Sequence, residues 1–100
     1  MNSNYQKGVR FERERLKAYE KLGYLCMRTA GSHGAFDLVA VSEKWNLVIL
    51  IQCKTTNDLA TANRLLKQFR EHPPMKPLDH IHQCMEVKVT GSTEVHSVTV

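Results

Sequence analysis

Polar side chains that could support metal-assisted chemistry interrupt two apolar segments of this sequence. Asp37 lies within the apolar run 36–41, although aspartate is disfavoured in strands. Gln52 and Lys54 directly follow the apolar segment 47–51, and residues two apart on a strand share a face. Carboxylate and amide oxygens suit a hard cation such as Mg²⁺, whereas zinc prefers histidine and cysteine. These residues therefore predict a site for a hard divalent cation.

A further polar residue, Glu12, stands on the apolar face of a predicted N-terminal helix. At about 100° per residue, Glu12 falls in the middle of a stripe of four apolar side chains: Tyr5, Val9, Leu16 and Tyr19. A carboxylate that faces the core is costly unless a metal ion or a buried cation pairs with it. The alternative is a partly exposed glutamate that reaches past the edge of the stripe.

The elements that must position these residues follow from periodicity and turn signals. The sequence predicts a helix that starts near the capping-box spacing at 3–6 and stops at Gly23, and a second helix over 59–71. Strands are predicted over 24–29, 35–42, 47–54, 85–90 and 94–100. The order α-β-β-β-α-β-β gives the fold class α/β, with a single mixed β-sheet of about five strands flanked by two helices.

The short connection at 43–46 brings the polar residues together. It makes the strands over 35–42 and 47–54 an antiparallel pair. Asp37, near the start of the first strand, then approaches Gln52 and Lys54 near the end of the second. Glu12 can join them from the covering helix, so we expect a cation site with a lysine beside it.

Length and composition limit the range of functions. A chain of 100 residues, 42% hydrophobic and 24% charged, predicts a single domain over 1–100 rather than two. The longest purely apolar run, 47–51, is far shorter than the ~20 residues of a membrane-spanning helix, so no membrane partner is expected. The N-terminus has no apolar stretch of signal-peptide type. Three widely spaced cysteines without a CxxC pair indicate reduced thiols, and hence a cytoplasmic, intracellular protein.

Positive charge is concentrated at the N-terminus. Residues 1–30 hold seven basic and three acidic side chains, which accounts for the whole formal net charge of +4. This distribution predicts a polyanionic partner, and nucleic acid is the commonest one. A basic, solvated helix without a partner is the alternative.

Four short segments between residues 5 and 54 also carry a family resemblance: Lys7-Gly8 followed by Glu12-Arg13, then 28–32, 36–40 and 51–54. In this order and spacing, the chain resembles the PD-(D/E)xK nuclease superfamily and, more narrowly, the archaeal-type Holliday junction resolvases. The resemblance covers about half of the chain. It implies a restriction-endonuclease-like fold and a metal-dependent nuclease that acts as a dimer on four-way DNA junctions.

The resemblance also implies a role for each matching residue. Glu12, Asp37 and Gln52 would bind the divalent metal, with Mg²⁺ expected and Mn²⁺ as a substitute. Lys54 would orient or activate water and offset developing charge. Ser32 would contact the phosphate near the cut, and it completes the expected catalytic set with Lys54 and the three ligands. Besides Ser32, four basic residues would bind the DNA: Lys7, Arg10, Arg13 and Arg28.

Two departures from the family pattern bear on these roles. Gln52 occupies a position where the narrower family usually has glutamate, so the site supplies two carboxylates instead of three. We expect weaker metal binding or a preference for Mn²⁺, and loss of activity is an open alternative. The segment between Ser32 and Asp37 is one residue longer than the pattern, which can shift Ser32.

These expectations combine into one function with three alternatives. The first interpretation is a homodimeric, Mg²⁺-dependent endonuclease that resolves four-way (Holliday) junctions in DNA recombination and repair. One alternative is another nuclease of the superfamily that acts on flaps or duplex DNA. A second is a junction-binding module that has lost catalysis through Gln52. A third is an α/β interaction domain in which the clustering of Glu12, Asp37 and Lys54 is chance. A cellular and a viral origin both stay open.

Overall fold

The helices and strands follow one another in the order predicted from the sequence. The computed structural model describes residues 3–29 and 34–100. Ser32 lies outside the described residues, as do the side chains of residues 3–5, including Tyr5 of the predicted stripe. The described part contains α1 (Ser3–Lys21), β1 (Leu25–Arg28), β2 (Leu38–Ser42), β3 (Leu47–Thr56), α2 (Leu59–Glu71), β4 (Ile81–Val89) and β5 (Val95–Thr99). Neither of these two helices is long and apolar enough to cross a membrane.

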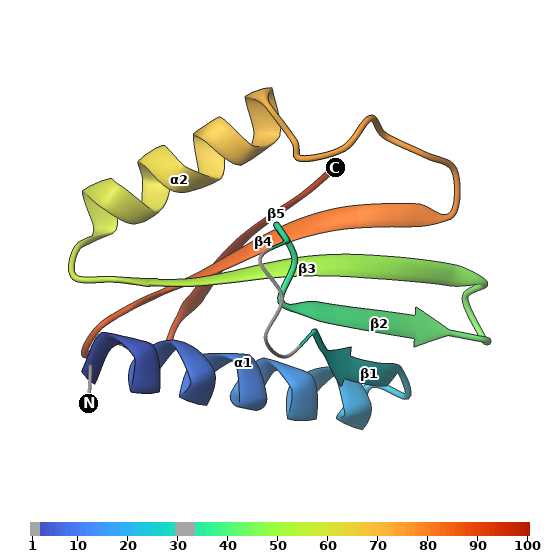
Figure 1. Cartoon of the computed structure of the whole chain (residues 1–100), viewed down its shortest axis with the longest axis horizontal. Helices are drawn as coiled ribbons and strands as arrows, with labels where there is room; N and C mark the ends of the chain where they lie inside the picture. The colour runs from blue at the N-terminus through green and yellow to red at the C-terminus, as the bar shows by residue number, and fades with distance from the viewer. Residues whose placement is uncertain (1–2, 30–33) are drawn as a thin grey trace.

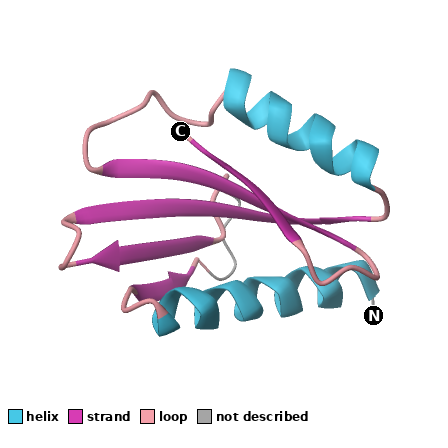
Figure 2. Ribbon diagram, turned by 180° about the vertical axis from the view of Figure 1, so that it is seen from behind, coloured by secondary structure: helices cyan, strands magenta, loops and turns pink. Residues whose placement is uncertain are grey.

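The five strands form one mixed sheet in the order β1-β2-β3-β4-β5. Neighbouring strands are antiparallel except β3 and β4, which run parallel and are connected through α2. A parallel pair needs such a crossover because both strands start at the same edge of the sheet. Figures 1 and 2 show α1 and α2 on opposite sides of the strands. α1 packs on β1, β2 and β3, while α2 packs on β3, β4 and β5.

The side of α1 that meets the sheet differs in part from the predicted stripe. Phe11, which the stripe omits, is 2% exposed, and Tyr19 is buried, while Val9 is only half-buried. Phe11, Arg15 and Tyr19 follow one another at four-residue spacing, which places them on one side of the helix. The packed side of α1 is therefore rotated toward Phe11, whose ring joins a core that includes Ile51 of β3.

α1 ends one turn before β1, close to the predicted stop. Gly23 has a φ of 93°, a conformation that glycine adopts without the strain other residues incur. The Tyr24 amide donates to the Tyr19 carbonyl at 3.1 Å, and the two rings meet edge to face with their centroids 5.5 Å apart. This turn directs the chain from the helix into the edge strand of the sheet.

β3 and β4 are longer than the sequence predicted. Their parallel register runs from Val48↔Ile81 to Thr56↔Val89, so β4 begins at Ile81 rather than at residue 85. Gln83 is polar and interrupts the apolar pattern, so the sequence did not indicate a strand here. The residue is nevertheless only 1% exposed. Its side chain accepts from the Met75 amide at 2.9 Å and donates to the Met75 carbonyl at 3.0 Å. Burial is possible because both ends of the amide group are satisfied.

Candidate active site

The candidate site lies where β2 and β3 part. β2 begins at Leu38, which pairs with Ile51, so residues 52–56 of β3 continue beyond it. Gln52 and Lys54 lie on this continuing segment. Polar side chains can therefore gather at the fork without disturbing the paired, buried part of the sheet.

Asp37 lies at the vertex of this fork, one residue before β2 rather than inside it as predicted. Its amide donates to the Ile51 carbonyl at 2.8 Å, and its carbonyl accepts from the Thr29 amide at 2.9 Å. Its carboxylate Oδ2 accepts from the Cys53 amide at 2.8 Å. The side chain of Asp37 thus takes the place that a partner strand's carbonyl would fill, beside the residue between Gln52 and Lys54.

Glu12 reaches the site from α1 and is paired with a cation. Its Oε1 accepts from Arg28 Nε at 3.2 Å, and the two side chains are 19% and 24% exposed. The sequence left open whether a metal ion, a buried cation or solvent would satisfy Glu12. The contact is with a guanidinium, and both groups retain access to solvent and therefore to a ligand.

Local backbone contacts bring the Glu12–Arg28 pair close to Asp37. Arg28 is the last residue of β1 and pairs with Leu38. The next residue, Thr29, donates a hydrogen bond from its amide to the Asp37 carbonyl. Its hydroxyl donates to the Phe36 carbonyl at 2.7 Å. The end of β1 therefore fixes both the cation that holds Glu12 and the backbone that presents Asp37.

The Cys53 thiol reports the negative charge around the fork. Burial raises its pKa above the ordinary value, and the charge of Glu86 raises it further. The charges of Asp37 and Glu12 act in the same direction. Three carboxylates, on α1, on β4 and just before β2, thus act on this thiol in the same direction as its burial.

Gln52 faces the other side of the sheet from Glu12. Ile51 and Cys53 belong to the core beneath α1, so alternation places Gln52 on the α2 side. Gln52 pairs with Met85, and both line a hollow against α2. Lys54 shares this alternation and is exposed. Asp37, at the fork between the two faces, is the residue that links the two groups.

The donor set fits a hard cation with two charged ligands. Among the described residues, no three histidine, cysteine, aspartate or glutamate side chains group so as to hold a metal ion. The predicted oxygen donors are the carboxylates of Glu12 and Asp37 and the amide oxygen of Gln52, of which Gln52 lies on the opposite side of the sheet from Glu12. The contacts above engage one oxygen of each carboxylate. Oxygen donors of this kind suit Mg²⁺ or Mn²⁺ and not zinc.

Basic side chains of α1 and β1 surround a hollow next to Glu12. Three of the predicted DNA-binding residues line it, namely Arg10, Arg13 and Arg28. Lys17 also lines it, although the prediction did not include it. Its position four residues after Arg13 is the signal that could have identified it, because such residues are neighbours on a helix surface. Lys7 lies outside this hollow, which we call the basic hollow.

Glu86 on β4 is a buried acid that the prediction missed. It is 4% exposed and accepts from Arg15 Nε at 2.6 Å, from Arg15 Nη2 at 3.4 Å and from the Tyr19 hydroxyl at 2.7 Å. Burial raises the Tyr19 pKa, and the bond to Glu86 raises it further. Its place between apolar strand residues was a signal of the same kind as that of Asp37. Because its oxygens are held by these donors, Glu86 does not replace the acid missing at Gln52.

Comparisons with known proteins agree with one another. The family model described as "Archaeal holliday junction resolvase (hjc)" matches residues 3–63, which include Glu12, Asp37, Gln52 and Lys54. The crossover junction endodeoxyribonuclease Hjc of Methanocaldococcus jannaschii is 40% identical over 57 residues, which make up 57% of this chain and 41% of that protein. The chain therefore spans less than half the length of this relative.

A solved structure shares the fold. It is that of Archaeoglobus fulgidus Hjc, described as a Holliday junction resolvase from an archaeal hyperthermophile. The match has a TM-score of 0.55 and 23% sequence identity, and it covers 86% of this chain and 67% of that chain. The likeness covers more of the chain than the family match over residues 3–63, so part of the C-terminal half belongs to the shared architecture.

Proposed function

The chain belongs to the archaeal Holliday junction resolvase family, and on that premise we propose that it is an endonuclease that cuts four-way DNA junctions by metal-dependent phosphodiester hydrolysis. The observation that carries this proposal is the position of Asp37. Its carboxylate is held at the fork by the amide of Cys53, between the strand positions of Gln52 and Lys54. Such a fork presents acid, amide and lysine side chains from adjacent strands to one substrate.

We assign a divalent cation to the oxygen donors at the fork. Glu12 and Asp37 would hold it with their carboxylates, and Gln52 would add a neutral amide oxygen. Mg²⁺ is the expected ion and Mn²⁺ the substitute. When bound, such a cation lowers the pKa of coordinated water and polarises the phosphate.

The other side chains of the site act on the phosphate directly. Lys54 is exposed beyond the fork and would stabilise the negative charge that builds on the phosphate in the transition state. Ser32 would contact the same phosphate. The Cys53 amide of β3 fixes the orientation of the Asp37 carboxylate. This catalytic side chain is therefore held in place by the sheet.

The basic hollow would bind the DNA backbone beside the cut. Four cationic side chains line it, and Arg28 also pairs with Glu12. Phosphate contacts of this kind fix the position of the DNA without reading its sequence. Selectivity for branched DNA would then come from the shape of the junction.

We further propose a homodimer that works inside the cell. A four-way junction offers two equivalent strands for cutting, and a twofold dimer matches that symmetry. β1 is an edge strand. Its residues Leu25 and Met27 are exposed, as is Leu22 in the turn before it, which gives an apolar surface for association. The free cysteines Cys26, Cys53 and Cys84 fit a reducing compartment. Light scattering of the purified protein measures the subunit number.

Cleavage of an immobile synthetic four-way junction tests the main proposal. The junction is incubated with the protein and Mg²⁺, Mn²⁺ or EDTA, beside a linear duplex and a flap of matched sequence. We expect paired, symmetric nicks in the junction with either metal and none with EDTA. Equal cutting of flap or duplex would instead indicate another nuclease specificity.

A second candidate, a junction-binding module without catalysis, is favoured by one observation. Gln52 brings no charge and lies on the α2 side of the sheet, opposite α1 and Glu12. Tight binding to the junction with no cut under either metal would support this candidate. The same assay therefore separates the two functions.

A further inference from the structure

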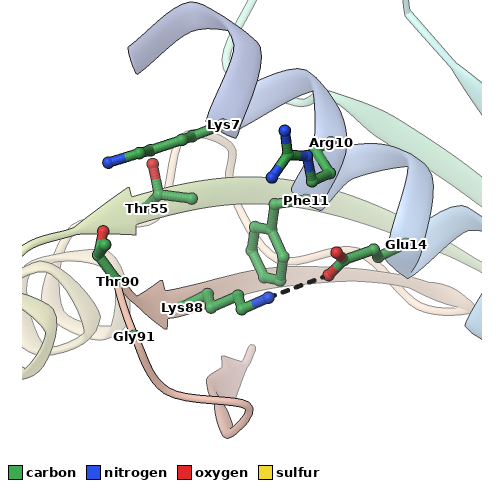
Figure 3. Close-up of a pocket in the computed structure, with 8 residues that line it drawn as sticks. All are labelled: Lys7, Arg10, Phe11, Glu14, Thr55, Lys88, Thr90 and Gly91. Atoms are coloured by element: carbon green, nitrogen blue, oxygen red, sulfur yellow. Dashed lines mark hydrogen bonds and ion pairs between the residues drawn. The ribbon is translucent and has the colours of Figure 1, made fainter. Parts of the chain in front are cut away.

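A second hollow lies between the first half of α1 and the ends of β3 and β4 (Figure 3). Side chains from three elements and the turn after β4 line it: Lys7, Arg10, Glu14, Thr55, Lys88 and Thr90. We call it the Lys7 pocket. It shares Arg10 and Glu14 with the basic hollow, so the two depressions are neighbours along α1.

Cationic groups dominate the Lys7 pocket. Lys7 and Arg10 are exposed, and they form no ion pair with any residue in the described part of the chain. Lys88 Nζ lies 3.2 Å from Glu14 Oε2, drawn as the dashed line in Figure 3. Three positive charges against one negative charge leave the pocket with two positive charges in excess. Such an excess raises the local concentration of anions.

Neutral donors and an apolar floor complete the Lys7 pocket. Thr55 and Thr90 bring hydroxyl groups, and Figure 3 shows the Thr55 hydroxyl directed toward Lys7. The Thr90 amide donates to the Thr56 carbonyl at 2.8 Å, which fixes the turn after β4. Phe11 is buried beneath these groups, and a low-polarity floor strengthens electrostatic contacts above it.

We propose that the Lys7 pocket binds a backbone phosphodiester of a junction arm, away from the phosphate that is cut. This inference rests on the proposed function for the identity of the ligand. Phosphate oxygens accept hydrogen bonds from several directions, as ammonium, guanidinium and hydroxyl donors on three elements require. Lys7 precedes Glu12 by five residues, about 7.5 Å along the helix axis. A DNA strand rises about 3.4 Å per nucleotide, so the next phosphates of one arm fall within reach.

The Lys7 pocket gives the C-terminal half of the chain a part in substrate binding. Lys88 and Thr90 lie beyond residue 63, where the family match ends. They come next to α1 because β4 runs parallel to β3 and ends beside it, with Thr56 opposite Val89. An isolated N-terminal half would therefore lack one wall of the pocket.

Lys7→Gln and Lys88→Gln test this inference, with Lys67→Gln on the exposed side of α2 as the matched control. Junction binding is measured in EDTA by fluorescence anisotropy across a salt series, and cleavage is measured in Mg²⁺ at saturating protein. The logarithm of the affinity falls as the logarithm of the salt concentration rises, and each phosphate contact adds about 0.9 to the magnitude of this slope. We expect each pocket variant to lower the magnitude of that slope by about one, and the wild type to cut the junction. Circular dichroism confirms that the variants are folded.

The possible outcomes separate this inference from the proposed function. Slopes of both pocket variants equal to that of Lys67→Gln would overturn the Lys7 pocket, whether or not the wild type cuts. If the wild type does not cut the junction but the variants have slopes of lower magnitude, the proposed nuclease function is wrong and DNA binding by the Lys7 pocket is supported. Inorganic phosphate titrated alone by NMR distinguishes a free-phosphate site. If phosphate perturbs Lys7 and Lys88 while junction slopes stay unchanged, assignment to DNA is wrong.

Discussion

Glu86 forms a cluster with Arg15 and Tyr19 of α1, which we call the Glu86 cluster, and Glu12 of the same helix pairs with Arg28. The two acids differ in burial and in the number of hydrogen bonds that they accept. Glu86 is 4% exposed and accepts three hydrogen bonds from Arg15 and Tyr19. Glu12 is 19% exposed and meets Arg28 through one oxygen at 3.2 Å. A charge removed from water must have its partners within the protein. A charge that keeps contact with water can exchange a partner for a ligand.

This difference separates a contact that fixes α1 from one that can take part in chemistry. The contact joins Arg15 and Glu86, which are 71 positions apart in the chain, so the cluster fastens α1 to β4, an interior strand of the sheet. Glu12 stands three residues before Arg15 on the same helix. The buried cluster therefore sets the position from which Glu12 reaches the fork. Asp37 belongs with Glu12 in this comparison, because its contact with the Cys53 amide also engages one oxygen.

The largest effect is expected for Asp37→Asn. The asparagine oxygen can still accept from the Cys53 amide, so the fork keeps its shape while the negative charge is lost. A ligand to a catalytic cation contributes several kcal/mol, so single-turnover cleavage should fall by at least about a thousandfold. Junction binding in EDTA should remain. Asp79→Asn, in the exposed loop before β4, is the matched control. Loss of binding along with cleavage would mark Asp37 as structural.

The next effect is on stability and concerns Glu86. Glu86→Ala leaves Arg15 and Tyr19 without their common acceptor, and breaking a buried pair costs about 3 kcal/mol at the lower end of the usual range. The lower end applies because Arg15 keeps 25% of its side chain exposed. Glu12→Gln should change the free energy of unfolding by less than about 1 kcal/mol, since the pair is partly solvated. Urea unfolding of both variants measures the contrast, and equal losses would remove the distinction between the two acids.

The sequence predicted the parts of this comparison that depend on local pattern. Alternation and the 43–46 turn were sufficient for the order of elements and for the approach of Asp37 to β3. The interrupted apolar run that marked Asp37 also marks Glu86. The pattern alone did not predict the ion pair of Glu86, because its partner Arg15 lies 71 positions away in the chain. The pairing depends on the parallel register of β3 and β4, which no local pattern specifies.

The sequence also could not show on which side of the sheet each site residue lies. The predicted stripe of α1 omitted Phe11, because periodicity alone does not show how the helix is rotated on the sheet. The same limit applies to Gln52, whose face relative to α1 follows from which strand residues α1 covers. Gln83 hid the start of β4 because a buried amide is satisfied by the backbone of Met75, and such a contact is not visible in a hydrophobicity pattern.

A smaller effect is expected for Gln52→Glu, which adds a third carboxylate at the fork. Metal affinity rises with the charge of the ligand set. The Mg²⁺ concentration for half-maximal cleavage should fall by about tenfold, which corresponds to about 1.4 kcal/mol. Gln68→Glu is the matched control, because Gln68 lines the same hollow from α2. A Mg²⁺ dependence that is unchanged, or changed equally by both variants, would exclude Gln52 as a ligand and leave the cation to Glu12 and Asp37.

The smallest effect separates Arg13 from Arg15, two residues apart on α1. Arg13 is exposed and lines the basic hollow, whereas Arg15 turns inward to Glu86. Arg13→Ala removes one phosphate contact, so the slope of log junction affinity against log salt should drop by about one. Its free energy of unfolding should stay within about 0.5 kcal/mol of the wild type. An unchanged slope would remove Arg13 from the DNA contacts. A loss of stability would instead show that the exposed side of α1 takes part in holding the helix, and the division between the two sides of α1 would then fail.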